Sequence, residues 1–164
     1  MILAVTGHRP SKLGGHKAHV YRSLRNLARE SLKELEPELV LTGMALGWDM
    51  AIADACVELG IPFDAYIPCR DQEKIWPANS QRHYYDLICA AHRVVYVSQA
   101  TYSPRLMMLR NCRMVEDASH LLALWDGSKG GTAHCVGYAI EKHVPVTNHW
   151  DRYAKIATLT PEKK

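Results

Sequence analysis

The chain has 164 residues, of which 48% are hydrophobic and 23% are charged, and its formal net charge is +3 with neutral histidines. This length predicts one domain over residues 1–164, and the composition excludes an intrinsically disordered protein. A net charge this small argues against a nucleic-acid-binding protein, because such domains carry a dense basic face. We therefore do not expect nucleic acid as a partner.

Cysteine usage bears on the compartment and on metal binding. The five cysteines are an odd number and form no CxxC pair, which argues against a disulfide framework and against a structural zinc site. The first residues lack the basic and long apolar regions of a signal peptide, and no apolar run is long enough to cross a membrane. We expect a cytoplasmic protein with no membrane association, no metal and no resident cofactor.

The first half of the chain alternates short apolar runs with longer segments whose apolar residues have helical spacing. In chain order it predicts a strand at 2–5, a helix at 18–35, a strand at 39–41, a helix at 49–59 and a strand at 63–67. Asp49 is the expected N-cap of the second helix, and Gly60 is expected to end it in the left-handed conformation.

The second half continues the same alternation. It predicts a helix from Asn79 or Ser80 to about 91, a strand at 93–97, a helix at 104–118, a strand at 121–125, a helix at 132–142, a strand at 144–147 and a short helix at 150–159. Ser103 with Pro104, and Thr132, have the residue types of helix starts. Strands that alternate with helices predict an α/β protein with a mainly parallel sheet, covered by helices on both faces as three α/β/α layers.

Glycines and polar residues gather directly after three of these strands. In a parallel sheet such loops share the edge where ligands bind. The first loop, Thr6 to Gly15, carries Gly7, His8 and Arg9 together with Lys12, so that two cations could meet a phosphate. A solvated surface loop is the alternative interpretation.

The second loop holds Gly43 and Gly47 before Asp49. Glycines four residues apart let the backbone approach a ligand closely, although a purely structural turn would need them equally. Asp49 could cap the helix, bind a ribose hydroxyl, or do both. Trp48 could stack on a base or pack in the core.

The third loop gives the strongest signal for an anion-binding site. Between an apolar strand and a helix it carries Asp126, Gly127, Ser128, Gly130, Gly131 and Thr132. Backbone N–H groups at such a helix start suit a phosphate. The loop lacks the GxxxxGK[ST] spacing of a P-loop and the GxGxxG spacing of dinucleotide oxidoreductases, so neither class is predicted. A glycine turn with a structural role alone is the alternative.

These three loops, with further segments between them, resemble the bacterial and phage SLOG proteins of the YpsA-like type. The matching segments are TGHRP at 6–10, KLGG at 12–15, GMALGWD at 43–49, YVS at 96–98, YS at 102–103, M at 108, RN at 110–111, MV at 114–115, WDGS at 125–128 and GGTA at 130–133. The resemblance implies a Rossmann-like fold with a pocket for nucleotides or nucleotide-derived ligands. The wider superfamily includes the DNA-processing protein that loads recombinase on single strands, the cytokinin-activating Lonely Guy enzymes and sensor domains of bacterial defence systems.

The Lonely Guy enzymes cleave the N-glycosidic bond of nucleoside monophosphates with an Arg-Lys pair and a PGGxGTxxE loop. In this chain the arginine is matched by Arg110, whereas Asn111 stands in the place of the lysine. Cys135 stands where those enzymes have the catalytic glutamate, and a thiol cannot replace a carboxylate in that reaction. Asp126 or Asp49 could supply a carboxylate from another loop, so the sequence leaves open whether the protein is an enzyme.

The sequence thus predicts a module that binds a nucleotide-like small molecule. Hydrolysis of nucleoside 5′-monophosphates is the alternative, and single-stranded DNA binding is a third. The expected binding residues are Gly7, His8, Arg9, Gly43, Gly47, Asp49, Arg110, Asn111, Asp126, Gly127, Ser128, Gly130, Gly131 and Thr132. A homodimer or higher oligomer is also expected, because the run Leu106 to Leu109 gives one helix an apolar surplus; burial of that helix within the monomer is the alternative.

Overall fold

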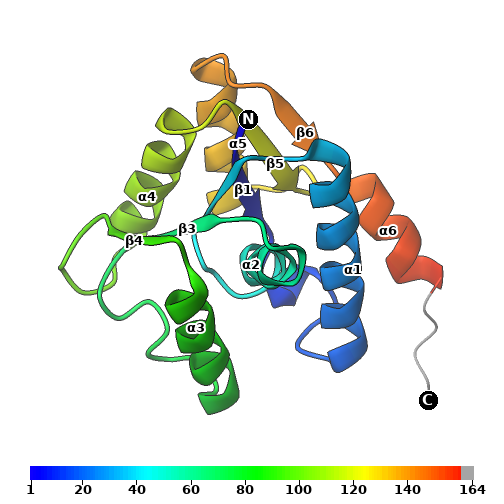
Figure 1. Ribbon diagram of the computed structural model, residues 1–164, viewed down its shortest axis with the longest axis horizontal. Helices are drawn as coiled ribbons and strands as arrows, with labels where there is room; N and C mark the ends of the chain where they lie inside the picture. The colour runs from blue at the N-terminus through cyan, green and yellow to red at the C-terminus, as the bar shows by residue number, and fades with distance from the viewer. Residues whose placement is uncertain (160–164) are drawn as a thin grey trace.

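The computed structural model describes residues 1–159 and contains one sheet whose strands all pair in parallel. The strands are β1 (Ile2–Gly7), β2 (Leu39–Thr42), β3 (Phe63–Ile67), β4 (Arg93–Tyr96), β5 (His120–Leu124) and β6 (Val146–Asn148). Their spatial order is β4-β3-β2-β1-β5-β6 (Figure 1). This confirms the α/β class and the parallel sheet.

Helices cover both faces of the sheet, as the apolar strands predict. The helices are α1 (Ala18–Leu35), α2 (Trp48–Leu59), α3 (Ala78–Ala90), α4 (Pro104–Glu116), α5 (Gly131–Glu141) and α6 (Trp150–Leu159), with a 3-10 turn at Pro10–Lys12. Figure 1 shows α1, α2 and α6 on one side of the strands and α4 and α5 on the other. Two cores separate these layers: one joins Leu3 and Val5 to Leu24, and the other joins Ala4 to Val136. The three-layer Rossmann-like architecture is confirmed.

The strand order determines where a ligand site can form. From β1 the chain moves outward through β2 and β3 to β4, and α4 then carries it back to β5 on the other side of β1. The direction of the strand order therefore reverses between β1 and β5. The loops that follow these two strands diverge there and leave a crevice at the carboxyl edge of the sheet.

Two of the predicted helix ends are confirmed. The Ser103 hydroxyl accepts a hydrogen bond from the Leu106 N–H, with Pro104 as the first residue of α4. Gly60 ends α2 in the left-handed conformation, with φ of 69°.

Three predicted helix starts are wrong. α2 begins at Trp48, with Gly47 rather than Asp49 as its N-cap. α5 begins at Gly131, with Gly130 in place of Thr132 as N-cap, and α3 begins at Ala78 after Pro77. At the first two sites the N-cap backbone has a φ of 95° and 145°, which a glycine adopts without the strain that a β-carbon would cause. At both starts, the N-cap residue is therefore determined by the backbone conformation that the turn into the helix requires, and not by a side chain that could cap the helix.

Smaller differences concern the ends of elements. The last strand lies at Val146–Asn148 rather than at 144–147, and α4 ends at Glu116 rather than at 118. Within residues 1–159, no helix combines the length and apolar character that a membrane span requires.

Candidate functional site

A cavity of about 370 Å³ opens at the reversal of strand order. The loops after β1 and β5, the loop before α2 and the first turns of α4 and α5 enclose it. Its lining residues are Thr6, Gly7, His8, Arg9, Ser11, Lys12, Ala45, Asp49, Tyr102, Pro104, Met107, Met108, Arg110, Asn111, Gly130, Gly131 and Thr132.

One wall of the cavity is the N-terminus of α5. The N-cap residue Gly130 has no side chain with which to cap the helix, and Gly130, Gly131 and Thr132 all line the cavity. The first N–H groups of a helix have no partner within it, and the helix dipole gives this end a partial positive charge. This wall therefore suits an anion.

Cationic side chains add to that positive potential. Arg9 and Lys12 reach the cavity from the loop after β1, and Arg110 reaches it from α4. The Arg110 guanidinium is buried, with 5% of the residue exposed, and burial lowers its pKa against the opposing effect of Asp49. A buried guanidinium with one nearby carboxylate is a favourable place for a second anion.

Arg110 is held in place by a chain of hydrogen bonds. Its Nη1 donates to the Gly43 carbonyl, and its Nε donates to the Asn111 Oδ1 at 2.9 Å. Asn111 in turn donates from Nδ2 to the Gly131 carbonyl at 3.3 Å. A β-carbon on Gly43 would lie 2.0 Å from the Arg110 Nη1, so the guanidinium occupies the space that the glycine leaves open.

Asp49 supplies the one carboxylate among the lining residues. Its Oδ2 accepts from the Ala45 N–H at 3.3 Å, whereas its Oδ1 is buried without a hydrogen-bond partner among the residues that the structure describes. Burial raises the pKa of Asp49 to about 6, although Arg110 acts in the opposite direction. An unsatisfied carboxylate oxygen of this kind can accept a hydrogen bond from a hydroxyl group.

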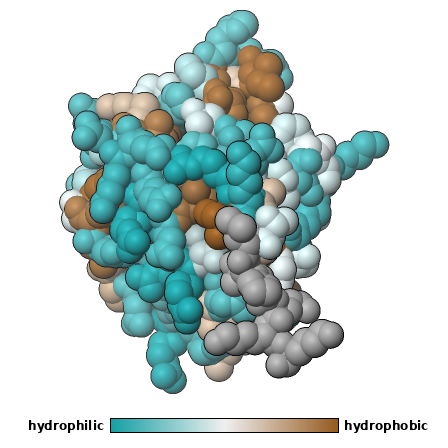
Figure 2. Space-filling view, turned by 90° about the vertical axis from the view of Figure 1, so that its right-hand side faces the viewer, coloured by the Kyte–Doolittle hydropathy of each residue, from teal (hydrophilic) through white to brown (hydrophobic). Residues whose placement is uncertain are grey.

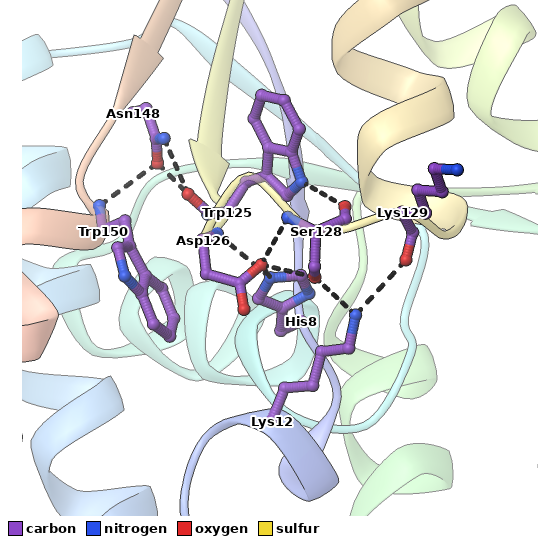
Figure 3. A network of polar contacts seen from close by, with 8 residues as sticks. All are labelled: His8, Lys12, Trp125, Asp126, Ser128, Lys129, Asn148 and Trp150. Carbon is purple, nitrogen blue, oxygen red and sulfur yellow. Dashed lines mark hydrogen bonds and ion pairs between the residues drawn. The ribbon is translucent and has the colours of Figure 1, made fainter.

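The loops after β1 and β5 are tied together beside the cavity (Figure 3). Asp126 Oδ1 lies 2.6 Å from the His8 Nε2 and accepts from the Ser128 N–H at 2.9 Å. The Lys12 Nζ donates to the Ser128 Oγ at 2.6 Å and to the Lys129 carbonyl at 3.3 Å. Hydrogen bonds from Ser128, and then His8, hold the pKa of Asp126 well below its usual range. These contacts hold the two loops at a fixed distance from each other.

The predicted site residues divide into two groups in space. Nine of them line the cavity: Gly7, His8, Arg9, Asp49, Arg110, Asn111, Gly130, Gly131 and Thr132. The other five, Gly43, Gly47, Asp126, Gly127 and Ser128, are not among its lining residues.

Three of those five have a clear supporting contact. The Gly43 carbonyl accepts a hydrogen bond from Arg110. Asp126 and Ser128 make the hydrogen bonds that join the loop after β5 to the loop after β1. A β-carbon on Gly47 would approach the His8 carbonyl to 2.7 Å, so this glycine lets α2 pack close to the first loop.

Trp48 packs in the core rather than facing the cavity. It is fully buried, and a β-carbon on Gly7 would lie 2.5 Å from its Cδ1. Of the two roles left open by the sequence, core packing is therefore the one that Trp48 has, and it cannot stack on a base in this cavity.

Tyr102, Met107 and Met108 line the cavity but are not among the binding residues that the sequence predicts. Met107 and Met108 lie on the same helix as Arg110 and Asn111 and precede them by one turn. The sequence signal was this spacing of three and four residues, which places side chains on one helix face.

A sequence model of the YpsA family, described as the YspA SLOG family, matches residues 3–158. The chain belongs to this SLOG family. Within the matched range lie all the loops that form the cavity. The resemblance predicted from the separate motifs is confirmed.

Two similar curated proteins come from bacilli. The SPbeta prophage-derived protein YoqJ of Bacillus subtilis strain 168 is 30% identical over 116 residues, which span 60% of this chain and 67% of that protein. A UPF0398 protein of Bacillus thuringiensis strain Al Hakam is 23% identical over 170 residues, which span 96% of this chain and 92% of that protein.

Solved structures share the fold at lower identity. DNA processing protein A from Helicobacter pylori, described by its single-stranded DNA binding mode, superposes with a TM-score of 0.64 at 18% identity. The match covers 90% of this chain and only 64% of that one. The molybdenum cofactor carrier protein of Chlamydomonas reinhardtii gives 0.58 at 14% identity, covering 96% and 82%. At such identities these SLOG members support the fold alone.

Within residues 1–159, no group of three or more His, Cys, Asp or Glu side chains is arranged to hold a metal ion. Cys135 is fully buried, and burial raises the pKa of its thiol to about 12. This thiol is therefore protonated and shielded, unlike a reactive cysteine.

Proposed function

We propose that this SLOG protein binds a nucleotide or a nucleotide-derived phosphate in the cavity between β1 and β5. The observation that carries the proposal is the convergence of the uncapped N-terminus of α5 with the buried Arg110 on one cavity. Both features favour a negative charge, and they lie at the topological position where α/β proteins hold ligands.

The lining residues suggest how such a ligand lies. The phosphate meets the N–H groups of Gly130 to Thr132, with Arg9 and Lys12 as further donors. A ribose hydroxyl donates to Asp49, whose Oδ1 lacks a partner among the described residues. A ligand with a phosphate at one end and hydroxyl groups beside it matches this set of donors and acceptors.

Gly131 offers a sharp test of the phosphate position. A β-carbon added there meets nothing within 4 Å, and its φ lies outside the range that disfavours a side chain. Gly131→Asp therefore places a carboxylate where the phosphate should lie. Gly131→Ala is the matched control, because it adds the same β-carbon without the charge. An acidic residue in the first turn also suits the helix dipole, so the fold of the Asp variant should persist.

We expect AMP or ribose 5-phosphate to raise the melting temperature of the wild type and of Gly131→Ala, and not that of Gly131→Asp. Thermal denaturation with and without ligand measures this directly. Equal stabilisation of the Asp and Ala variants would rule out this position for the phosphate.

Hydrolysis of a nucleoside 5′-monophosphate is the second candidate, and Asp49 is the specific observation in its favour. A carboxylate with a pKa of about 6, in a cavity with cations, has the properties of a general acid–base group. In that reaction water adds to C1′ of the ribose, the N-glycosidic bond breaks, and the base leaves with a proton. Incubation of wild type and Asp49→Asn with a panel of mononucleotides should then release free base and ribose 5-phosphate from the wild type alone. A panel left intact by the wild type would leave binding as the function.

Single-stranded DNA is the third candidate. Two SLOG neighbours in structure are DNA processing proteins, so the comparisons give no support to the expectation that nucleic acid is not a partner. A salt-dependent mobility shift of a single-stranded oligonucleotide would favour this candidate over a mononucleotide.

A further inference from the structure

A second cavity adjoins the first. It measures about 220 Å³ and shares Arg9, Tyr102 and Met107 with the first cavity. Its own walls come from the segment after β3, with Asp71, Gln72, Lys74, Ile75 and Trp76. The three shared residues place the two cavities side by side.

The walls of the second cavity differ in chemistry from those of the first. Trp76, Tyr102 and Met107 offer flat or polarisable apolar surface, and the rim residue Ile75 is 93% exposed. Such surface is favoured for contact with an aromatic ring. The anion-binding features of the first cavity, the α5 N-terminus and Arg110, do not line the second.

Hydrogen-bond acceptors stand beside this apolar surface. The Gln72 side chain is 6% exposed; its Nε2 donates to the Gly43 carbonyl at 3.0 Å, and its Oε1 is buried without a partner among the described residues. Asp71 adds a carboxylate, of which Oδ1 accepts from the Tyr102 N–H at 2.8 Å. An unsatisfied amide oxygen next to a carboxylate favours a ligand that carries N–H donors.

The two cavities are also joined through one backbone group. The Gly43 carbonyl accepts from Gln72 on one side and from Arg110 on the other. Two contacts hold the segment after β3 in place. The Arg70 N–H donates to the Ala100 carbonyl at 3.2 Å, and the Trp76 ring packs edge-on against the Tyr84 ring with 5.5 Å between the ring centroids. The second cavity is thus preformed in a fixed relation to the first.

We propose that the second cavity is the subsite for the base of the ligand, and that it takes an aromatic base carrying an amino group. The base lies against Trp76 and Tyr102, and its N–H groups donate to Asp71 and Gln72. This inference rests on the proposed function, because it places the phosphate of the same ligand in the first cavity. The side chain of Arg9, common to both cavities, lies between the two ends of the ligand.

Three ligands test the proposal by calorimetric titration: AMP, purine riboside 5′-monophosphate, which lacks the amino group, and ribose 5-phosphate, which lacks the base. We expect the wild type to bind AMP more tightly than both others. Trp76→Ala should weaken AMP binding about tenfold, as expected for loss of one stacking contact, and leave ribose 5-phosphate binding unchanged. Asp71→Asn keeps an acceptor for the Tyr102 N–H and should reduce the preference for the amino group.

Ile140→Ala is the control, because Ile140 is 63% exposed on α5 and lines neither cavity. It should match the wild type for all three ligands. Equal affinity of the wild type for AMP and ribose 5-phosphate would overturn the base subsite and leave the phosphate site standing. If the wild type binds neither AMP nor ribose 5-phosphate, the proposed function is overturned as well. The wild-type comparison holds even if Trp76→Ala does not fold.

Discussion

Asp49 and Arg110 are two charged residues that line the cavity, each with 5% of its area exposed. Burial disfavours the charged form of both, and each partly compensates the other. The compensation is incomplete for Asp49, because one carboxylate oxygen has no hydrogen-bond partner among residues 1–159. A buried acid left in this condition lowers the stability of the folded chain and is poised to interact with a ligand.

The pH dependence of stability should report this burial. The pKa of Asp49 rises from 3.8 to about 6 on folding, so the folded state binds the proton more tightly than the unfolded state does. Stability is then greatest below the lower value and is lost as the pH rises through the higher one. Relative to Asp49→Asn, the wild type should lose about 2 kcal/mol of unfolding free energy between about pH 4 and pH 7.

Urea denaturation of both proteins across this pH range measures the difference. The asparagine keeps an oxygen that can accept from the Ala45 N–H, so it removes the titration and retains the contact. Parallel stability curves for the two proteins would contradict the burial of a titrating carboxylate.

At the scale of secondary-structure elements, two glycines have opposite roles. Gly43 follows β2 and lies against the Arg110 side chain, whereas Gly137 lies within α5 with nothing within 4 Å of an added β-carbon. Gly43→Ala forces Arg110 from its place and should lower the unfolding free energy by about 1–3 kcal/mol. Gly137→Ala should raise it by about 0.5–1 kcal/mol, because alanine favours a helix interior.

Denaturant titration distinguishes these two effects, and ligand titration adds a second readout. The Gly137 variant should bind AMP as the wild type does, and the Gly43 variant should bind it more weakly because Arg110 is displaced. A Gly43→Ala protein with wild-type stability and affinity would show that Arg110 does not depend on this glycine.

The sequence predicts the elements better than their starts. The strands and helices follow from periodicity, and each appears within a few residues of its expected range. The N-caps at Gly47 and Gly130 were missed because side-chain capping preferences favour Asp49 and Thr132. Both starts are set by the backbone conformation after the strand, in which the N-cap glycine has a positive φ. The packed fold imposes that conformation.

The candidate site, like the helix starts, is only partly predictable from the sequence. The glycine-rich loops predict the correct edge of the sheet, and nine of the predicted binding residues line one cavity. The sequence predicts Asp126 to Thr132 as one phosphate-binding segment, whereas only Gly130, Gly131 and Thr132 line the cavity and Asp126 binds His8 instead. That division depends on β5 pairing with β1, a tertiary contact that no local pattern reveals.

At the scale of the whole molecule, the outer surface is largely polar in the view of Figure 2, with apolar patches in places. On α4, Met108 and Leu109 are 45% and 49% exposed. The apolar surplus of this helix is therefore not fully buried within the monomer. Self-association through this face stays a prediction.

Light scattering tests that prediction. We expect a mass above the 18.5 kDa of one chain for the wild type and a mass close to it for Leu109→Lys. Met108 also lines the first cavity, so the substitution is made at Leu109, which lines neither cavity. A wild-type mass of one chain at high concentration would contradict self-association.

The central claim is that a phosphate binds at the N-terminus of α5, between the loops that follow β1 and β5. Titration of nitrogen-15-labelled protein with ribose 5-phosphate observes these N–H groups directly. The account predicts that the largest chemical-shift changes fall on the backbone amides of Gly130, Gly131 and Thr132 and on the Arg110 side chain. Saturable shifts confined to other parts of the chain, or no shifts at millimolar ligand, would contradict it.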